Sequence, residues 1–535
     1  MFSGLMKKIL PVVWFLPGFL LWAAYPPMGE RMDVLFALAP LMWLSRREVN
    51  AGIVAKRWFQ AGCFFWVATL SWMPAIVKNG GPWPLVVLGW FALAAYCAAY
   101  FAAYGFLGAK YWGWARGRSY RWRVLGILMV EPILWCGLEL IRSRFLGGFA
   151  WNQLGVVSIN SGFGSPAALG GVYLCSAVVI LINGTIAGIA ERVWKPEQSG
   201  FANLKKLGSV ETLLAFALVW GIYGWSGSIV GRSADGDARC SDHLKVAMVQ
   251  RNFPCVFQRQ EENPYEVYGK LVENFAALKP DLIVLPESAL CEFGPVDQQG
   301  AIRFAEWMTK NGAGLLLTGG TRFSEGLTYN SAALYNGDEM QVYDKVHLVP
   351  FGEFIPGDKL FPALQKFAPV GSCTAGDPQL LYHPMGPTPF GVAICFEDTD
   401  SALMRRYAAM GARFLCFITN DSWFSHSIES EQHAWQAVAR AIETGLPVVR
   451  VGNSGVTGTI TPAGRTSWLI GPNGRPLVDR QGTMFDRLGI AGGERPTPYV
   501  LLGDVPLGII FALLILGMIL VKYKHYYEKR RFVSL

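Results

Sequence analysis

The distribution of apolar residues divides the chain into two unlike parts. Residues 1–231 contain seven runs of mostly apolar residues, and an eighth run lies near the end of the chain. A helix that crosses a lipid bilayer needs about 20 such residues. The pattern therefore predicts an α-helical membrane bundle of eight transmembrane helices, which lie near Ile9–Tyr25, Asp33–Leu44, Trp58–Val77, Pro84–Ala109, Val124–Ile141, Pro166–Ala190, Val210–Val230 and Val505–Val521.

Between the seventh and eighth runs the pattern changes to short apolar strands that alternate with amphipathic helices. This alternation predicts one α/β domain over residues 232–504, between a membrane domain at 1–231 and a last helix with a basic tail at 505–535. Strands are expected at Lys245–Gln250, Asp281–Pro286, Leu315–Thr318, Ala332–Tyr335, Phe390–Cys395 and Phe414–Thr419, and helices at Glu261–Leu278, at Ala301–Lys310 and from Asp398 to Met410.

Composition and charge agree with a membrane protein. Hydrophobic residues make up 52% of the 535 residues and charged residues only 16%, against about 25% charged in a soluble domain. The net charge of +8 combines +11 in residues 1–231, −7 in residues 232–521 and +4 in the tail. Disorder is excluded by the apolar content. Nucleic acid is not an expected partner, because no dense basic run is interleaved with aromatic residues.

Basic residues also predict how the chain crosses the membrane. With the N-terminus in the cytoplasm, the cytoplasmic segments hold 20 Lys and Arg residues, and the short outer loops hold four, namely Arg31, Lys78, Arg142 and Arg144. Cytoplasmic loops normally carry such an excess. We therefore expect both termini in the cytoplasm and the acidic α/β domain on the extracytoplasmic side, tethered to the bilayer at both ends.

Three residues at predicted strand ends could carry chemistry. Glu287 directly follows a strand apolar enough to be buried, so its pKa should be raised towards that of a general base. Cys395 ends a strand and precedes a helix, a position that favours the thiolate. Lys345 could supply positive charge to an oxyanion. A residue of each type at such a position is more commonly structural or exposed to solvent. The hypothesis of a catalytic site therefore rests on the order of the three residues along the chain.

The surrounding motifs give these residues a context. The domain contains LPES at 285–288, YDKVHLVPFGEFIP at 343–356, CFED at 395–398 and TNDSWF at 419–424. This series resembles the nitrilase superfamily (CN hydrolases), which has a Glu–Lys–Cys triad on a four-layer αββα sandwich. Together with eight spans and the GFAWNQLG run at 148–155, the chain is similar to the membrane-anchored apolipoprotein N-acyltransferase family over nearly its whole length.

The resemblance implies roles for individual residues. Glu287 matches the catalytic base, Lys345 the charge-stabilising lysine and Cys395 the nucleophile. The supporting positions are Glu353, a second glutamate near the triad, Glu397, two residues after the nucleophile, and Asn420 and Trp423 of the N-D-x-W-F segment. Glu443 matches a structural acid, followed by Arg450 and the run Asn453-Ser454-Gly455.

Three residues depart from the family pattern. Phe396 stands where the family commonly has Tyr, so one hydroxyl is lost beside the nucleophile. Ser425 stands where Gly is usual, and Arg259 lies near a position often held by Trp. None of these departures affects the triad.

The resemblance also implies a reaction and its setting. A fatty acyl chain would pass from a membrane phospholipid, through a thioester on Cys395, to the free α-amino group of the N-terminal diacylglyceryl-cysteine of an apolipoprotein, the last step of lipoprotein maturation. The protein would be a monomeric acyltransferase in a bacterial inner membrane, with its catalytic domain in the periplasm and the bilayer as its further partner.

Two other interpretations remain open from sequence. One is a membrane-tethered nitrilase-type amidase that acts on small amides. The other is a non-enzymatic scaffold or transporter, although Glu131 and Glu139 are the only ionisable candidates within the spans. No cofactor is expected, and no metal either, since His426 and His433 lack an accompanying ligand motif. A disulfide among Cys240, Cys255, Cys291, Cys373 and Cys416 is open, whereas Cys395 must stay free.

Overall fold

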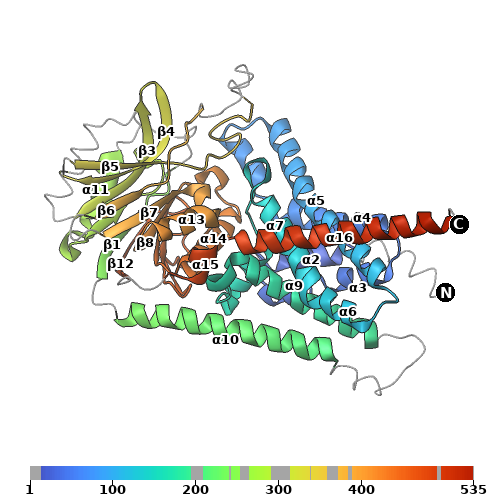
Figure 1. The fold of residues 1–535 in the computed structure, drawn as a ribbon. Coiled ribbons are helices and arrows are strands. Elements are labelled where there is room, and N and C mark those ends of the chain that lie inside the picture. Colours follow the sequence, from blue (N-terminus) through green and yellow to red (C-terminus); the bar gives the residue numbers. More distant parts are fainter. Residues whose placement is uncertain are drawn as a thin grey trace. The chain divides into compact units, whose positions relative to one another are not determined.

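A computed structural model describes residues 14–193, 209–239, 243–253, 264–290, 306, 314–337, 339–357, 372–383, 388–490 and 496–533. The chain forms two compact units. The first comprises residues 1–71, 90–226 and 502–535, and the second comprises residues 72–89 and 227–501. The short segment 72–89 therefore groups with the α/β domain, although its flanking helices belong to the helical unit (Figure 1).

The first unit is a bundle of helices. Six helices of the described chain are long and apolar enough to cross a membrane: Ala51–Asn79, Trp83–Ala115, Tyr120–Arg142, Ala167–Val193, Val210–Gly231 and Val505–Lys524. They correspond to the third to eighth predicted runs. The element bounds are α2 Leu16–Ala23, α3 Ala39–Arg47, α4 Ala51–Thr69, α5 Trp83–Ala115, α6 Tyr120–Leu125, α7 Glu131–Arg142, α8 Leu154–Ser158, α9 Ala167–Val193, α10 Val210–Arg239 and α16 Val505–Val533.

The predicted number of eight spans is not confirmed. The first run begins in residues outside the described part, and its described helix, α2, has 8 residues. The second run forms a 3-10 helix, Arg31–Leu35, and then α3, which has 9 residues and begins next to Pro40. A helix of 9 residues rises about 14 Å, roughly half the hydrocarbon core. The described part of this run therefore contains no continuous spanning helix.

The two acidic side chains within the spans have partners inside the bundle. Glu131 on α7 forms an ion pair of 2.7 Å with Arg46 on α3, and it accepts a hydrogen bond from the Trp112 indole at 3.0 Å. Glu139 accepts a hydrogen bond from the backbone N–H of Leu154 at 2.8 Å. Because isolated charge is costly in hydrocarbon, these contacts account for both acids structurally and give no support to a translocation path.

The second unit contains two six-stranded sheets. The first has the order β12-β1-β2-β3-β4-β5 and the second the order β11-β10-β9-β8-β7-β6. Parallel pairs β1–β2–β3 and β7–β8–β9 form the centres, and antiparallel strands form the edges. The bounds are β1 His243–Gln250, β2 Leu282–Val284, β3 Leu315–Ser324, β4 Leu327–Asn336, β5 Glu339–Asp344, β6 Leu380–His383, β7 Thr388–Ile394, β8 Phe414–Thr419, β9 Val448–Gly452, β10 Gly458–Ile460, β11 Thr466–Trp468 and β12 Gly482–Gly489.

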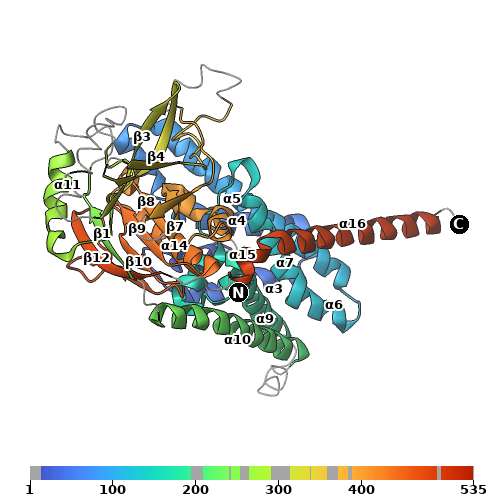
Figure 2. The same ribbon diagram turned by 60° about the vertical axis from the view of Figure 1, so that its left-hand side comes forward.

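The sheets pack face to face between helices. Strand β1 contacts β9 and strand β4 contacts β7, so the two inner faces form one core. Helix α11 (Pro264–Glu273) lies on β1, while α13 (Ser401–Ala409) and α14 (Glu429–Thr444) lie on β7 and β9. Figure 2 shows these helices on opposite sides of the sheets. The predicted αββα sandwich is confirmed.

Local chemistry explains where these elements begin and end. All six residues of β8 are buried, which agrees with its uninterrupted apolar sequence. Helix α13 begins at Ser401, directly after Asp400, whose carboxylate accepts hydrogen bonds from the backbone N–H groups of Ala402 and Leu403. The β3–β4 hairpin turns through Glu325 and Gly326, both at positive φ, as a two-residue hairpin turn requires. The predicted helix at Ala301–Lys310 lies almost wholly outside the described residues.

Candidate active site

The two sheets each contribute to one cluster of chemical groups. Glu287 follows β2 and Lys345 follows β5, both in the first sheet, whereas Cys395 follows β7 in the second sheet. The Lys345 Nζ lies 4.0 Å from Glu287 Oε1 and 2.9 Å from Glu353 Oε1. The Cys395 thiol interacts electrostatically with Glu287, Lys345 and Glu353. The structure thus brings together the four residues that the sequence placed in one site.

Close backbone packing sets the position of Glu287. A Cβ on Gly319 of β3 would lie 2.5 Å from the Glu287 Cα and 2.8 Å from the Ser288 nitrogen. Any other residue at 319 would therefore push the Glu287 segment away from the sheet. Leu285, two residues earlier, donates its backbone N–H to the Leu317 carbonyl at 2.8 Å, which continues the β2–β3 pairing up to the site.

Asn330 is a member of the cluster that the sequence analysis missed. Its amide nitrogen donates to Glu287 Oε1 at 2.8 Å and to Glu353 Oε1 at 2.6 Å, and its carbonyl accepts from the Lys345 backbone N–H at 2.8 Å. The side chain therefore holds two carboxylates apart while the backbone fixes the lysine. An Asn inside strand β4, where this residue type is depleted, is a signal that could have identified it.

Burial and charge determine the ionisation of these groups. Burial raises the pKa of the Glu287 carboxyl, and the Lys345 ammonium opposes this shift. Although burial opposes it, Glu353 and Glu287 raise the pKa of Lys345, which stays charged. The raised pKa of Glu287 agrees with its predicted role as a base, and the raised pKa of Lys345 agrees with its predicted positive charge.

The expected preference for a Cys395 thiolate is wrong. Burial, followed by the charge of Glu287, raises the pKa of the Cys395 thiol well above its ordinary value. The helix that begins at Cys395 is a 3-10 helix of only 5 residues, too short for its dipole to offset desolvation and a neighbouring carboxylate. Cys395 therefore rests as a thiol, and a base would have to remove its proton before the sulfur could act as a nucleophile.

Glu397 connects the nucleophile segment to the lysine segment. Its carboxylate is completely buried and accepts from the backbone N–H groups of Ile394, Val346 and His347 at 2.7–3.0 Å, and from the Tyr343 hydroxyl at 2.9 Å. These donors come from both sides of the site. Glu397 therefore fixes the spacing between Cys395 and Lys345.

The N-D-S-W-F loop is held from two directions. The Asn420 side chain accepts from the Ser422 hydroxyl at 2.7 Å and from the Asn453 amide at 2.9 Å. The Asn79 amide, from segment 72–89, donates to the carbonyl oxygens of Ser422 and Trp423 at 3.2 and 2.7 Å. The sequence does not predict this contact, because nothing local to Asn79 indicates a partner more than 300 residues away.

The remaining predicted positions have structural roles. Glu443 is buried in an ion pair with Arg440 at 2.7 Å, and Arg450 is buried between Asp398 and Asp421. Phe396 is half-buried beside the nucleophile. Ser425 has φ −45° and ψ 145°, a conformation that needs no glycine, so this departure from the family pattern leaves the loop unstrained. Arg259 lies outside the described residues.

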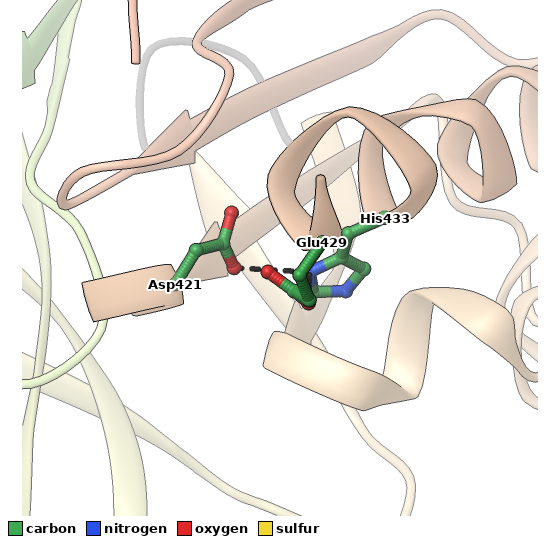
Figure 3. Close-up of side chains that lie close together, drawn as sticks. All are labelled: Asp421, Glu429 and His433. Atoms are coloured by element: carbon green, nitrogen blue, oxygen red, sulfur yellow. Dashed lines mark hydrogen bonds and ion pairs between the residues drawn. The ribbon is translucent and has the colours of Figure 1, made fainter. Parts of the chain in front are cut away.

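Histidine 433 belongs to a buried cluster whose groups could ligate a metal. Ligand atoms of Asp421, Glu429 and His433 all lie within 4.8 Å of one another (Figure 3). The two nitrogens of His433, however, each lie 3.0 Å from a carboxylate oxygen, of Asp421 and Asp398 respectively. A metal would need one of these nitrogens deprotonated, so the contacts fit an ion-pair network better. His426 lies apart, exposed and beside Asp479.

The thiols of Cys395 and Cys416 are free, while Cys240, Cys255 and Cys291 lie outside the described residues. The Cys395 thiol is therefore free, as its predicted role as the nucleophile requires.

Comparisons with known proteins give matches over both parts of the chain. The family model for carbon-nitrogen hydrolases matches residues 245–485, and the model for the apolipoprotein N-acyltransferase N-terminal domain matches residues 17–185. Among solved structures, an amidase from Nesterenkonia matches with a TM-score of 0.36 and 16% identity, over 50% of this chain and 95% of its own. A carbon-nitrogen hydrolase from Helicobacter pylori matches with a TM-score of 0.35 and 18% identity, over 46% and 89%.

Curated relatives match over much more of the chain. The apolipoprotein N-acyltransferase of Geobacter metallireducens is 31% identical over 84% of this chain and 84% of its own, and that of Photobacterium profundum is 28% identical over 91% and 90%. The fold and the Glu, Lys and Cys cluster define a membrane-anchored member of the carbon-nitrogen hydrolase class. Within that class, the chain belongs to the apolipoprotein N-acyltransferase family.

Proposed function

We propose that this protein transfers a fatty acyl chain from a membrane phospholipid to the free α-amino group of the N-terminal diacylglyceryl-cysteine of apolipoproteins. The proposal rests on one observation: Glu287, Lys345 and Cys395 lie close together in a protein that also has six long apolar helices in its described part. A small-amide amidase would need no such anchor. Family membership over both parts favours lipoprotein N-acylation over an amidase or a transporter.

In the first half-reaction, the Glu287 carboxylate accepts the thiol proton as the Cys395 sulfur attacks the phospholipid ester carbonyl. The negative charge that develops on the carbonyl oxygen is held by the Lys345 ammonium and a backbone N–H near Phe396. The ester C–O bond breaks, and Glu287 returns the proton to the leaving glycerol oxygen. A lysophospholipid departs and the acyl chain remains on Cys395 as a thioester.

In the second half-reaction, the lipoprotein amine attacks the thioester carbonyl. Glu287 accepts a proton from the amine, the C–S bond breaks, and the sulfur regains a proton as the amide forms. Two half-reactions through one covalent intermediate predict ping-pong kinetics. Asn330 positions the base through its hydrogen bond to Glu287, and Glu353 positions the lysine through its ion pair with Lys345.

The lipid substrates explain the membrane part. Moving a long acyl chain into water costs about 0.8 kcal/mol per CH₂ group. A site held at the bilayer surface avoids this cost for both donor and acceptor. We infer an inner-membrane location with the catalytic domain on the periplasmic side. The Asn79 contacts support this placement, since Asn79 follows Lys78 in the short loop that the charge pattern puts outside and also packs on the catalytic domain.

Mass spectrometry of the intact protein tests the proposed function. Incubation of the full-length enzyme with phosphatidylethanolamine, without acceptor, should add one acyl chain to Cys395. Addition of a diacylglyceryl-cysteine peptide should then remove the adduct and yield the N-acylated peptide. A Cys416→Ala variant, which loses another buried thiol of the same unit, should acylate normally. Absence of an adduct on Cys395, with small amides hydrolysed instead, would support the amidase.

The raised pKa of Glu287 predicts the acidic limb of the rate profile. Only the ionised carboxylate can accept the thiol proton, so acylation should slow as pH falls through that raised pKa, above the value of about 4.3 of an ordinary glutamate. The Glu353→Gln variant should move this limb to lower pH, because the charge of Glu353 raises the pKa of Glu287. Acylation rates measured from pH 4 to 8, on protein shown to remain folded, give the limb. An unchanged limb in Glu353→Gln would contradict the assignment.

A further inference from the structure

The backbone of the nucleophile is held in an unfavourable conformation. Cys395 has φ 54°, in the left-handed region that a residue with a side chain rarely adopts. Such a conformation is unfavourable and persists only when surrounding contacts impose it. The contacts around Cys395 therefore decide where its sulfur points, and they lie outside the triad.

One of these contacts comes from helix α14. The His433 Nε2 lies 3.3 Å from the Cys395 carbonyl oxygen and 3.0 Å from Asp398 Oδ1. The other ring nitrogen, Nδ1, lies 3.0 Å from Asp421 Oδ1 and 3.5 Å from Glu429 Oε1 (Figure 3). The imidazole is buried, and each nitrogen faces oxygen acceptors, so both nitrogens act as donors.

The charges around His433 are balanced by an arginine. Arg450 donates to Asp398 at 2.8 Å and lies 3.4 Å from Asp421, so both aspartates are shared between one arginine and one histidine. Although burial opposes it, Asp398 and Asp421 raise the pKa of His433 to about 10. Burial, followed by the charge of Asp421, raises the pKa of the Glu429 carboxyl well above its ordinary value.

The same network reaches the loop that contains Trp423. Asp421 begins the 3-10 helix Asp421–Phe424 and accepts from the Thr419 hydroxyl at 3.0 Å. The packing is close: a Cβ on Gly455 would lie 1.8 Å from Asp421 Oδ2. His433 therefore connects the carbonyl of the nucleophile, the acid three residues after it and the N-D-S-W-F loop.

We propose that His433 is a positioning residue for the reaction: its imidazole, held between Asp398 and Asp421, donates to the Cys395 carbonyl and fixes the backbone that aims the nucleophilic sulfur at Glu287 and Lys345. The proposal deepens the proposed function and rests on it for the role of Cys395. It assigns His433 no contact with substrate. The cluster in Figure 3 is then a scaffold for the nucleophile, built from charges that neutralise one another.

Two substitutions distinguish the role of the His433 Nδ1 donor from that of the Nε2 donor. His433→Asn retains a donor near the Nδ1 position and loses the donor to the Cys395 carbonyl, whereas His433→Gln places its amide nitrogen near the Nε2 position. Because a displacement of about 1 Å at a reacting atom can reduce a rate about 100-fold, we expect His433→Asn to acylate about 10- to 100-fold more slowly with KM for phospholipid unchanged. His433→Gln should recover part of the rate. His426→Asn, at the exposed histidine, is the control and should react normally.

A second measurement does not depend on the lipid reaction. Alkylation of Cys395 by iodoacetamide, followed by peptide mass spectrometry across pH, should be slowed in His433→Asn and partly restored in His433→Gln. If the alkylation rates follow this order but Cys395 of the wild-type protein accepts no acyl chain, the proposed function is refuted and the positioning role of His433 is still supported. Equal alkylation rates in all folded variants would overturn the positioning role, as would a stoichiometric tightly bound metal detected in the full-length protein. If His433→Asn does not fold, the rates of His433→Gln decide.

Discussion

Replacing Cys395 with alanine should abolish acyl transfer, with a loss of at least about 10⁴-fold in turnover. In the proposed mechanism the acyl chain is carried on the Cys395 sulfur, so both half-reactions lose their covalent intermediate. Fold and membrane insertion should be retained, because the change removes one half-buried sulfur atom and leaves Glu397 and its hydrogen bonds intact. Formation of N-acylated peptide from phospholipid, measured by mass spectrometry, checks the prediction.

The control for this change is Cys416→Ala, on the neighbouring strand β8. It also removes a buried thiol from the second sheet, but this side chain lies inside the strand, away from its end. Activity per folded molecule should stay within about twofold of wild type, since substitutions far from a site usually act through stability. Substantial turnover by Cys395→Ala would show that the chemistry does not pass through this sulfur.

Replacing Lys345 with methionine should reduce both stability and rate. The ammonium is 1% exposed and lies between two carboxylates, so its loss leaves Glu287 and Glu353 buried without a counter-charge. Removing one partner of a buried ion pair typically costs about 3–5 kcal/mol. Loss of a group that stabilises an oxyanion costs about 10²–10³-fold in rate. Thermal unfolding and acylation rates in the same detergent measure the two effects.

A surface lysine provides the comparison for this substitution. Lys245 is 3.6 Å from Asp281, and its side chain is 35% exposed. Lys245→Met removes the same charge from an ion pair, yet it should change stability by less than about 1 kcal/mol, because exposed pairs contribute little. Activity should be unaffected. Equal effects of the two substitutions on unfolding would contradict the charge-balanced site described for Lys345.

Much of the site could be predicted because its residues follow recognisable strands. Glu287 and Cys395 each lie just beyond an apolar strand, and β2, β7 and β8 could be located from apolar runs alone. Parallel strands end at the same edge of a sheet, so strand-end residues meet. The long apolar helices could be recognised for a similar reason, since a bilayer imposes a length that composition reveals.

Contacts made across the fold could not be predicted. Asn330 and Asn79 reach the site through single amide groups, and His433 reaches Cys395 from a different helix. None of these pairings leaves a periodic pattern along the chain. The expected Cys395 thiolate failed for the same reason: strand-to-helix order is visible in sequence, whereas the burial and neighbouring carboxylates that oppose ionisation are not.

The sequence by itself determined the class of protein and the division into helical and α/β parts, and it indicated Glu287, Lys345 and Cys395 as the candidate site residues. These depend on local periodicity and on short motifs, which a linear chain displays directly. Only the tertiary structure decided that two separate sheets bring these groups together, that Asn330 and Glu397 fix their spacing, and that the nucleophile rests as a thiol. Distance, burial and charge balance arise from packing, so they exist only once the chain has folded.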